Sequence, residues 1–487
     1  MNPTQILILL ISYFGLLFIL SYITGRNDSS DAFFKANSKA PWYLVAFGMI
    51  GASLSGVTFI SVPGWVGESH FSYLQVVAGY FIGYLIVAYI LLPVYYKLEL
   101  PSIYSYLSDR FGDKARKTGA FYFLVSRIIG ASFRLYLVAL VLHNYVFEPL
   151  AVPLEGTVVI SVALIYAYTY RGGIKTIVLT DTLQTLFMLI SVGLSVYLLL
   201  DSLELSFWEY IQSESFTSKS SIWVLDNPLQ SNYFVKSILG GIFITVSMTG
   251  LDQDMMQKNL SCKNLKQAQL NMISFSIVLV AVTALFVFLG ALLFSYAELK
   301  QIQIPFQNGS PRTDLLYPEI ALNGNLGPLV SISFFLGLIA AAYSSADSAL
   351  TALTTSVCFD FLGLEKKEAA TAVRTRKKVH FGLAVILILV IITFSHWINQ
   401  NVIDSLLTFA GYTYGPLLGL FAFGLLTKHN IQDTYVFPIT LGSVVLITLI
   451  ANYSSSLLGG YKLGYELLPL NGLITFILLF LGRSKNA

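Results

Sequence analysis

Charged residues are scarce in this sequence, because Asp, Glu, Lys and Arg make up only 11% of its 487 residues. Soluble domains carry roughly 25% charged residues, and a water-soluble chain with so few could not cover its own core. Hydrophobic residues make up 55%, and the mean hydropathy is +0.71. The composition excludes an ordinary soluble domain and indicates lipid as the main solvent.

Missing motifs exclude several functional classes. Cys262 and Cys358 are far apart, which rules out a disulfide framework and offers no metal-ligand spacing. No Walker lysine or glycine-rich phosphate loop is present, so a nucleotide-driven pump is not indicated. The five scattered histidines give no Ser-His-Asp arrangement or metal cluster. We therefore expect no enzyme activity, no organic cofactor and no nucleic-acid partner.

Thirteen apolar runs are long enough to cross about 30 Å of hydrocarbon as helices. They are too long for strands and lack alternation with period two. The first, Ile6–Ile23, has no Lys or Arg before it and no visible cleavage site, so we interpret it as a retained helix rather than a signal peptide. The runs lie near residues 5–25, 43–68, 74–97, 118–146, 151–170, 175–201, 233–256, 265–296, 327–360, 378–399, 402–427, 432–452 and 463–482.

The distribution of Lys and Arg orients these spans. With the N-terminus outside, 22 of the 29 Lys and Arg fall in inside segments and five fall outside. Such a bias follows the positive-inside rule and would collapse if one span were missed. The expected topology has the N-terminus outside and the C-terminus in the cytoplasm, with two external loops near 202–232 and 297–326 forming lids or short interfacial helices.

Small and polar residues concentrate in two spans, five spans apart. The second span carries Gly48, Gly51, Gly56 and Pro63 among several hydroxyls, and the seventh carries a similar set between Gly240 and Gly250. Transporters built from inverted repeats break corresponding helices near the bilayer midplane, where freed carbonyls coordinate ions. Close helix packing through small residues is the alternative interpretation.

The ninth span offers a row of oxygen ligands. Ala341, Ser344, Ser345 and Ser348 share one helix face, with Asp347 beside them. Hard cations prefer oxygen ligands, and a carboxylate at membrane depth normally faces a partner or a water-filled cavity. A hydroxyl-rich packing face, with Asp347 paired to a lysine, is the alternative.

Three further ionisable residues lie within spans. Asp181 is a second intramembrane carboxylate, near the inner end of the sixth span, and a salt bridge to Lys175 is the alternative to a functional role. Arg127 and Arg134, seven residues apart in the fourth span, share a face and each costs a few kcal/mol at a helix centre. They suit an anionic substrate group or structural pairs with Asp or Glu.

These motifs together resemble the sodium:solute symporter family, which includes sugar, proline, iodide and sialic acid cotransporters. The resemblance spans nearly the whole chain. It implies an all-α membrane protein of about 13 helices with a LeuT-type core of five-plus-five inverted repeats. The motifs are Gly51–Phe59, Gly172–Gln184, Asp252–Lys258, Ala341–Ser348 and Gly415–Gly419.

The resemblance divides the chain into five segments. The first repeat would occupy residues 43–201 and the second 233–427, joined by an external loop at 202–232. An extra helix with an inner loop at 1–42 would precede the core, and two helices within 428–487 would follow it.

The resemblance also implies the ligands of the coupling ion, Na⁺. The main sodium site would take carbonyls of Gly51, Leu54 and Ala341 and hydroxyls of Ser344 and Ser345. A second cation site would use Asp181, Ser344, Asp347 and Ser348. Asp347 stands where relatives have a hydroxyl, so it could bind a cation or accept a proton.

The substrate site implied by the resemblance lies beside the broken second span. Sialic acid transporters hold a carboxylate with an arginine whose aligned position here is Gly130, although Arg127 or Arg134 could substitute. A structural motif at Asp252, Gln253 and Gln257 completes the resemblance. The implied substrate-binding residues are Ser55, Thr58, Tyr73, Gln75, Arg127, Arg134, Thr245 and Met248.

We therefore expect a monomeric, sodium-coupled symporter that imports a small polar solute by alternating access across the bacterial inner membrane. A sugar, polyol or sugar acid suits the hydroxyls near Ser55 and Thr58. The alternatives are a proton-coupled carrier of the same fold and sodium-coupled uptake of an amino acid or small anion. A transporter-like sensor would need a signalling domain, for which the tail Gly482–Ala487 has no room.

Overall fold

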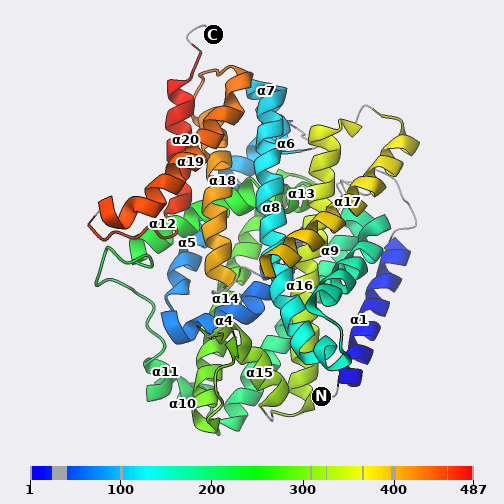
Figure 1. The fold of residues 1–487 in the computed structure, drawn as a ribbon, viewed down its shortest axis with the longest axis vertical. Helices are drawn as coiled ribbons and strands as arrows, with labels where there is room; N and C mark the ends of the chain where they lie inside the picture. Colours follow the sequence, from blue (N-terminus) through cyan, green and yellow to red (C-terminus); the bar gives the residue numbers. More distant parts are fainter. Residues whose placement is uncertain are drawn as a thin grey trace.

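The computed structural model is an assembly of long helices with the two chain termini at opposite ends (Figure 1). It describes residues 3–24, 41–98, 102–307, 310–324, 326–364, 367–395, 402–457 and 459–484. The side chains of residues 171–175 are not described. Some of the charges used for the expected topology lie outside the described residues or side chains: Arg26, Lys35, Lys39, Arg171, Lys175, Lys366 and Lys485.

The described residues contain nine to eleven candidate membrane spans, where the sequence predicts thirteen apolar runs. Nine helices are long and apolar enough to cross a membrane, and two further spans are helix pairs bent by more than 40°. Two shorter apolar helices, Leu154–Tyr170 and Leu467–Leu481, account for the remaining spans. The structure thus supports a multi-pass membrane protein.

The first half of the chain runs from α1 to α9. Its helices are α1 (Pro3–Thr24), α3 (Trp42–Ser53), α4 (Gly56–Ser69), α5 (Tyr73–Ile86), α6 (Leu92–Leu98), α7 (Ser105–Phe111), α8 (Asp113–Leu142) and α9 (Leu154–Ser202).

The second half runs from α12 to α20. Its helices are α12 (Phe234–Thr245) with its π-helical end η5 (Val246–Gly250), α13 (Gln253–Leu260), α14 (Leu265–Lys300), α15 (Leu316–Asn323), α16 (Pro328–Ser356), α17 (Ala369–Ser395), α18 (Val402–Leu426), α19 (Asp433–Leu457) and α20 (Leu467–Leu481).

Helix α9 is a single helix of 49 residues that covers both the fifth and the sixth expected span. A straight helix of that length would be about 74 Å long, more than twice the hydrocarbon thickness. Of its two apolar parts, Thr176–Ser202 is a candidate span and Leu154–Tyr170 is a shorter apolar helix. The inner connection expected between them therefore falls within helical backbone.

Two helices are interrupted at corresponding places, which supports the expected breaks. The pair α3 and α4 bends by 57°, and the pair α12–η5 and α13 bends by 64°. At the first break Leu54 (φ −82°, ψ 80°) and Ser55 (φ −77°, ψ 176°) leave the helical region. At the second, Asp252 caps α13 by accepting hydrogen bonds from Asp254 N at 3.0 Å and Met255 N at 3.4 Å.

Helix α16 forms the centre of the bundle. Its most apolar window is 83% buried, against 22% for α19 and 28% for α17. It packs along α9 and α8 and touches both α3 and α13. The oxygen-rich stretch of the sequence therefore lies where both broken helices meet the core.

The two expected external loops contain short elements. Helices α10 (Phe207–Gln212) and α11 (Glu214–Thr217) follow α9, and Ser206 and Glu209 form a capping box at the start of α10. The next loop contains a small hairpin, in which β1 (Phe306–Gln307) pairs with β2 (Ser310–Pro311). Figure 1 shows α10, α11 and α15 at the end of the molecule that holds the N-terminus.

Candidate functional site

The first of the two interrupted spans, formed by α3 and α4, lies directly against α9 and α16. Ser345 Oγ donates a hydrogen bond to the Ala52 carbonyl at 3.2 Å. A Cβ atom added to Gly51 would lie 3.4 Å from Ser344 Oγ and 3.3 Å from the Asp181 carbonyl, and it would overlap Thr185 Oγ1. A glycine at position 51 therefore lets the three helices approach closely.

Two of the expected main sodium ligands, Ser344 and Ser345, lie at this contact. Because the chain leaves the helical region at Leu54 and Ser55, carbonyls of the preceding turn lose the N–H partners of a continuous helix. Ala341, Ser344 and Ser345 are each at most 1% exposed. Free carbonyls and hydroxyls in a dry interior suit a hard monovalent cation.

The four residues of the expected second site also lie together, but a lysine joins them. Ser344 Oγ donates to Asp181 Oδ1 at 2.6 Å. Lys258 Nζ, from α13, donates to Asp181 Oδ2 and to Ser348 Oγ, both at 2.8 Å. The sequence analysis treated Lys258 only as an inside charge, yet it is 1% exposed.

Asp347 has a different environment from Asp181. Its Oδ2 accepts a hydrogen bond from Tyr168 OH at 2.7 Å, and its Oδ1 has no hydrogen-bond partner among the described residues. Asp347 is fully buried. A buried carboxylate with an unused oxygen is costly unless a cation or a proton compensates it.

The Asp252 motif forms a buried polar cluster below the first break. Arg127 donates to Asp254 Oδ2, and its Nη1 lies 3.7 Å from Asp252 Oδ2, which also accepts from Tyr414 OH at 2.7 Å. Gln253 Oε1 accepts from Ile103 N at 3.0 Å, and Gln257 Nε2 lies 3.4 Å from Thr355 Oγ1.

This cluster gives Arg127 acidic partners, in line with the structural alternative for that residue. Asp254 Oδ1 also lies 3.7 Å from Lys258 Nζ, so Asp254 links the guanidinium to the ammonium. Both charged groups of α13 are therefore part of one buried network.

A cavity of about 110 Å³ adjoins the first break. Seven of the eight expected substrate residues line it, together with Tyr80, Tyr84, Thr249 and Thr283, which sequence reasoning missed. Gln75 does not: it bonds the carbonyls of Ser72 and Asn232 and accepts from Val224 N, holding the external loop. The seven are Ser55, Thr58, Tyr73, Arg127, Arg134, Thr245 and Met248.

Arg134 is the cavity's cation without an acidic partner. No ion pair joins it to a carboxylate of the described residues, and its Nε has no hydrogen-bond partner among them. Arg127 lies seven residues earlier on the same face of α8, and its charge is neutralised by Asp254. The sequence could not distinguish the two arginines. In the structure, Arg127 is paired with a carboxylate, and the charge of Arg134 can still bind an anion.

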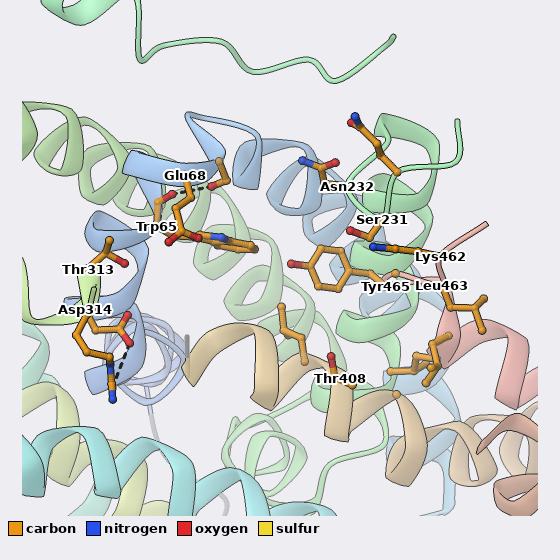
Figure 2. A pocket seen from close by; sticks show the side chains of 18 of the residues that line it. Trp65, Glu68, Ser231, Asn232, Thr313, Asp314, Thr408, Lys462, Leu463 and Tyr465 are labelled. Carbon is orange, nitrogen blue, oxygen red and sulfur yellow. Dashed lines mark hydrogen bonds and ion pairs between the residues drawn. The ribbon is translucent and has the colours of Figure 1, made fainter. Parts of the chain in front are cut away.

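A second cavity, of about 810 Å³, lies towards the external loops. Figure 2 shows Trp65, Glu68, Thr313 and Asp314 on one side of it, Asn232, Lys462 and Tyr465 on the other, and Thr408 below. Leu407 lines both cavities. The geometry is that of a wide cavity next to a small chamber lined by both polar and apolar side chains.

Comparisons with known proteins agree with this geometry. The model of the sodium:solute symporter family matches residues 33–432. The sodium/sialic acid symporter NanT of Aliivibrio fischeri is 25% identical over 450 residues, covering 87% of this chain and 83% of the relative. The mouse sodium-coupled monocarboxylate transporter 1 is 26% identical over 459 residues, covering 92% and 71%.

Solved structures show the fold. A Na⁺-coupled sialic acid symporter in a substrate-bound outward-open state matches with a TM-score of 0.81 at 19% identity, covering 99% of both chains. Mhp1, a nucleobase-cation-symport-1 family transporter, matches with a TM-score of 0.57 at 16% identity over 94% of both chains. The fold is therefore of the LeuT type.

The family model covers most of the chain, including both broken helices and the central helix α16. We conclude that the chain belongs to the sodium:solute symporter family, whose members are membrane transporters rather than enzymes.

Proposed function

We propose that this chain imports a small organic carboxylate together with sodium, with Arg134 as the group that holds the carboxylate. The observation that carries the substrate class is the position of Arg134 on the 110 Å³ cavity without an acidic partner among the described residues. Arg134 is partly buried. A guanidinium at a cavity wall without a carboxylate partner suits an anionic ligand, and Arg binds carboxylates through two parallel hydrogen bonds.

The size and lining of the chamber support a small solute. Binding pockets for drug-sized ligands occupy about 300–1,000 Å³, whereas this chamber holds about 110 Å³. Hydroxyls of Ser55, Thr58 and Thr245 can bond the solute's remaining polar groups. Relatives that transport monocarboxylates and sialic acid also support an acid over the neutral sugar or polyol that the sequence left open.

Coupling follows from the contact between the broken helix and α16. A sodium ion held by the carbonyls near Gly51 and Leu54 and by Ser344 and Ser345 would tie α3 to α16. Because Ser55 and Thr58 follow the same break, fixing it also shapes the solute chamber. Each ligand then favours the binding of the other by the same free energy.

A sodium-dependence experiment tests this function. Purified protein in liposomes should take up labelled small carboxylates with an inward sodium gradient and not with choline. A screen of thermal stability with and without sodium would select the solutes, since a true substrate stabilises more when sodium is bound. Uptake that ignores sodium would overturn the proposal.

Variants of the hydroxyls locate the ion. Ser344→Ala and Ser345→Ala should raise the sodium concentration for half-maximal uptake by roughly tenfold each, because a lost ligand costs about 1–2 kcal/mol. Thr393→Ala, which removes an exposed hydroxyl bonded only to its own helix, is the matched control.

Proton coupling is the second candidate, and Asp347 favours it. Asp347 is fully buried and its Oδ1 has no hydrogen-bond partner among the described residues. A proton would compensate its negative charge as well as a cation would. Uptake driven by a pH gradient in choline, lost in Asp347→Asn, would establish this alternative in place of sodium coupling.

A further inference from the structure

We propose that the ammonium of Lys258 is the resident cation of the second cation site, so that the transporter couples one sodium ion per cycle. This rests on the proposed sodium symport. The second site comprises Asp181, Ser344, Asp347 and Ser348, and Lys258 enters it from α13.

Lys258 uses the atoms that a second sodium would need. Its Nζ is 2.8 Å from Asp181 Oδ2 and 2.8 Å from Ser348 Oγ. The other oxygen of Asp181 accepts from Ser344 Oγ at 2.6 Å. Both carboxylate oxygens of Asp181 are thus occupied, and a second monovalent cation at the same place would face a like charge at close range.

The lysine has little room to move aside. Lys258 is 1% exposed, and the next acceptor, Asp254 Oδ1, lies 3.7 Å from Nζ. Asp254 already binds Arg127 through its other oxygen. If Lys258 left Asp181 for Asp254, it would lose two hydrogen bonds and leave the buried Asp181 carboxylate without its cation, which is strongly unfavourable.

The local charge balance leaves a place for one further cation. The second site holds two carboxylates and one ammonium: Lys258 contacts Asp181 at 2.8 Å and interacts electrostatically with Asp347, which bonds Tyr168. The main sodium site next to it consists of carbonyls and hydroxyls, which carry no charge. One net negative charge beside neutral ligands favours the binding of one sodium ion at the main site.

The two broken helices then have complementary parts. The break after α3 offers carbonyls to a mobile ion, while the bend of 64° before α13 turns that short helix towards α16, which it contacts. Lys258, in the last turn of α13, therefore reaches α9 and α16 at once. The break of the first repeat therefore offers carbonyl ligands for a mobile cation, and the bend of the second repeat brings in the tethered ammonium of Lys258.

The ratio of the sodium flux to the solute flux measures the number of sodium ions coupled per cycle. Proteoliposomes loaded with ²²Na⁺ and labelled solute should show one sodium per solute in the wild type. With a singly charged carboxylate, such transport would be electroneutral and produce no net current on a solid-supported membrane. A wild-type ratio of two would overturn the assignment of Lys258 while leaving sodium symport intact; a lack of any sodium-driven uptake would contradict the symport itself.

Variants at Lys258 separate this role from a structural one. Lys258→Gln should raise the ratio from one to two and make the sodium dependence sigmoidal, whereas Lys258→Arg, which keeps the charge, should stay at one. A ratio of one in a folded Lys258→Gln protein would overturn the proposal. If Lys258→Gln does not fold, the double variant Lys258→Gln/Asp181→Asn removes the unpaired charge and should fold. In that case the sodium-to-solute ratio of the wild type alone tests the proposal.

Discussion

Arg127 and Arg134 lie seven residues apart on α8, but only one has free charge to offer a solute. Arg127 binds Asp254 and lies 3.7 Å from Asp252, whereas no ion pair of the described residues involves Arg134. A guanidinium that is already paired with buried carboxylates contributes to folding, and one at a cavity wall without a carboxylate partner can bind an anionic solute. The same residue type thus has two roles on one helix.

Substituting each arginine by glutamine should give opposite patterns. Arg134→Gln should raise the KM for a carboxylate by about 10–100-fold with normal stability, because a charged hydrogen bond is worth about 1.5–3 kcal/mol. Arg127→Gln should lower thermal stability, since Asp254 would remain buried without its guanidinium at a cost of about 3–5 kcal/mol. Uptake kinetics and thermal melts would contradict this if both variants changed only KM.

At the scale of elements, glycines determine how closely the two repeats approach. Helices α5 and α12 fall in the two different repeats expected from the resemblance, and they pack along each other. A Cβ atom added to Gly241 would lie 3.1 Å from Gly79 Cα and would overlap the carbonyl oxygen of Val76. Backbone atoms cannot rotate away as a side chain can, so the helices would have to separate.

Gly241→Ala should therefore destabilise the protein by about 1–3 kcal/mol, as overpacking does in well-packed cores. The measurement is the melting temperature in detergent. Gly193→Ala on α9 is the matched control, because nothing lies within 4 Å of its added Cβ. It should be neutral or stabilise slightly, since alanine is the better helix former. Equal losses in both variants would show that the contact with α5 is not the cause.

The sequence predicted an all-helical membrane protein and its two broken helices, because hydropathy and small residues act locally. Composition alone did not place the first break, whereas the resemblance, with its carbonyl ligands at Gly51 and Leu54, did. Pro63, the strongest breaker in that span, lies inside α4, while the chain leaves the helical region at Leu54 and Ser55, which are neither Gly nor Pro. Contacts with α9 and α16 accompany the break, and such tertiary contacts are not visible in a linear pattern.

The candidate site shows the same limit. Hydroxyl spacing predicted the face of Ser344 and Ser345, but Lys258 was counted only as an inside charge. Its place beside Asp181, 77 residues earlier in the chain, depends on the direction of α13 after the bend. The signal available was the spacing of four between Asp254 and Lys258, which places both on one face of a helix.

At the scale of the whole molecule, the 810 Å³ cavity opens beside loops that the charge distribution places outside. We expect the structure to correspond to an outward-facing state, with Thr408 near the floor of the entrance (Figure 2). In alternating access, ligands that bind together shift the population between states. Sodium and solute should therefore change the accessibility of this cavity from outside.

Labelling with a membrane-impermeant maleimide on intact cells tests both orientation and motion. Thr408→Cys should react from outside, and sodium with solute should slow the reaction several-fold as the entrance closes. Ser218→Cys in the external loop should react at a constant rate, and Lys117→Cys should react only after the cells are opened. Cys262 and Cys358 are buried and should add little background. Labelling of Lys117→Cys but not Ser218→Cys in intact cells would invert the topology, and a Thr408→Cys rate indifferent to both ligands would remove the cavity from the transport path.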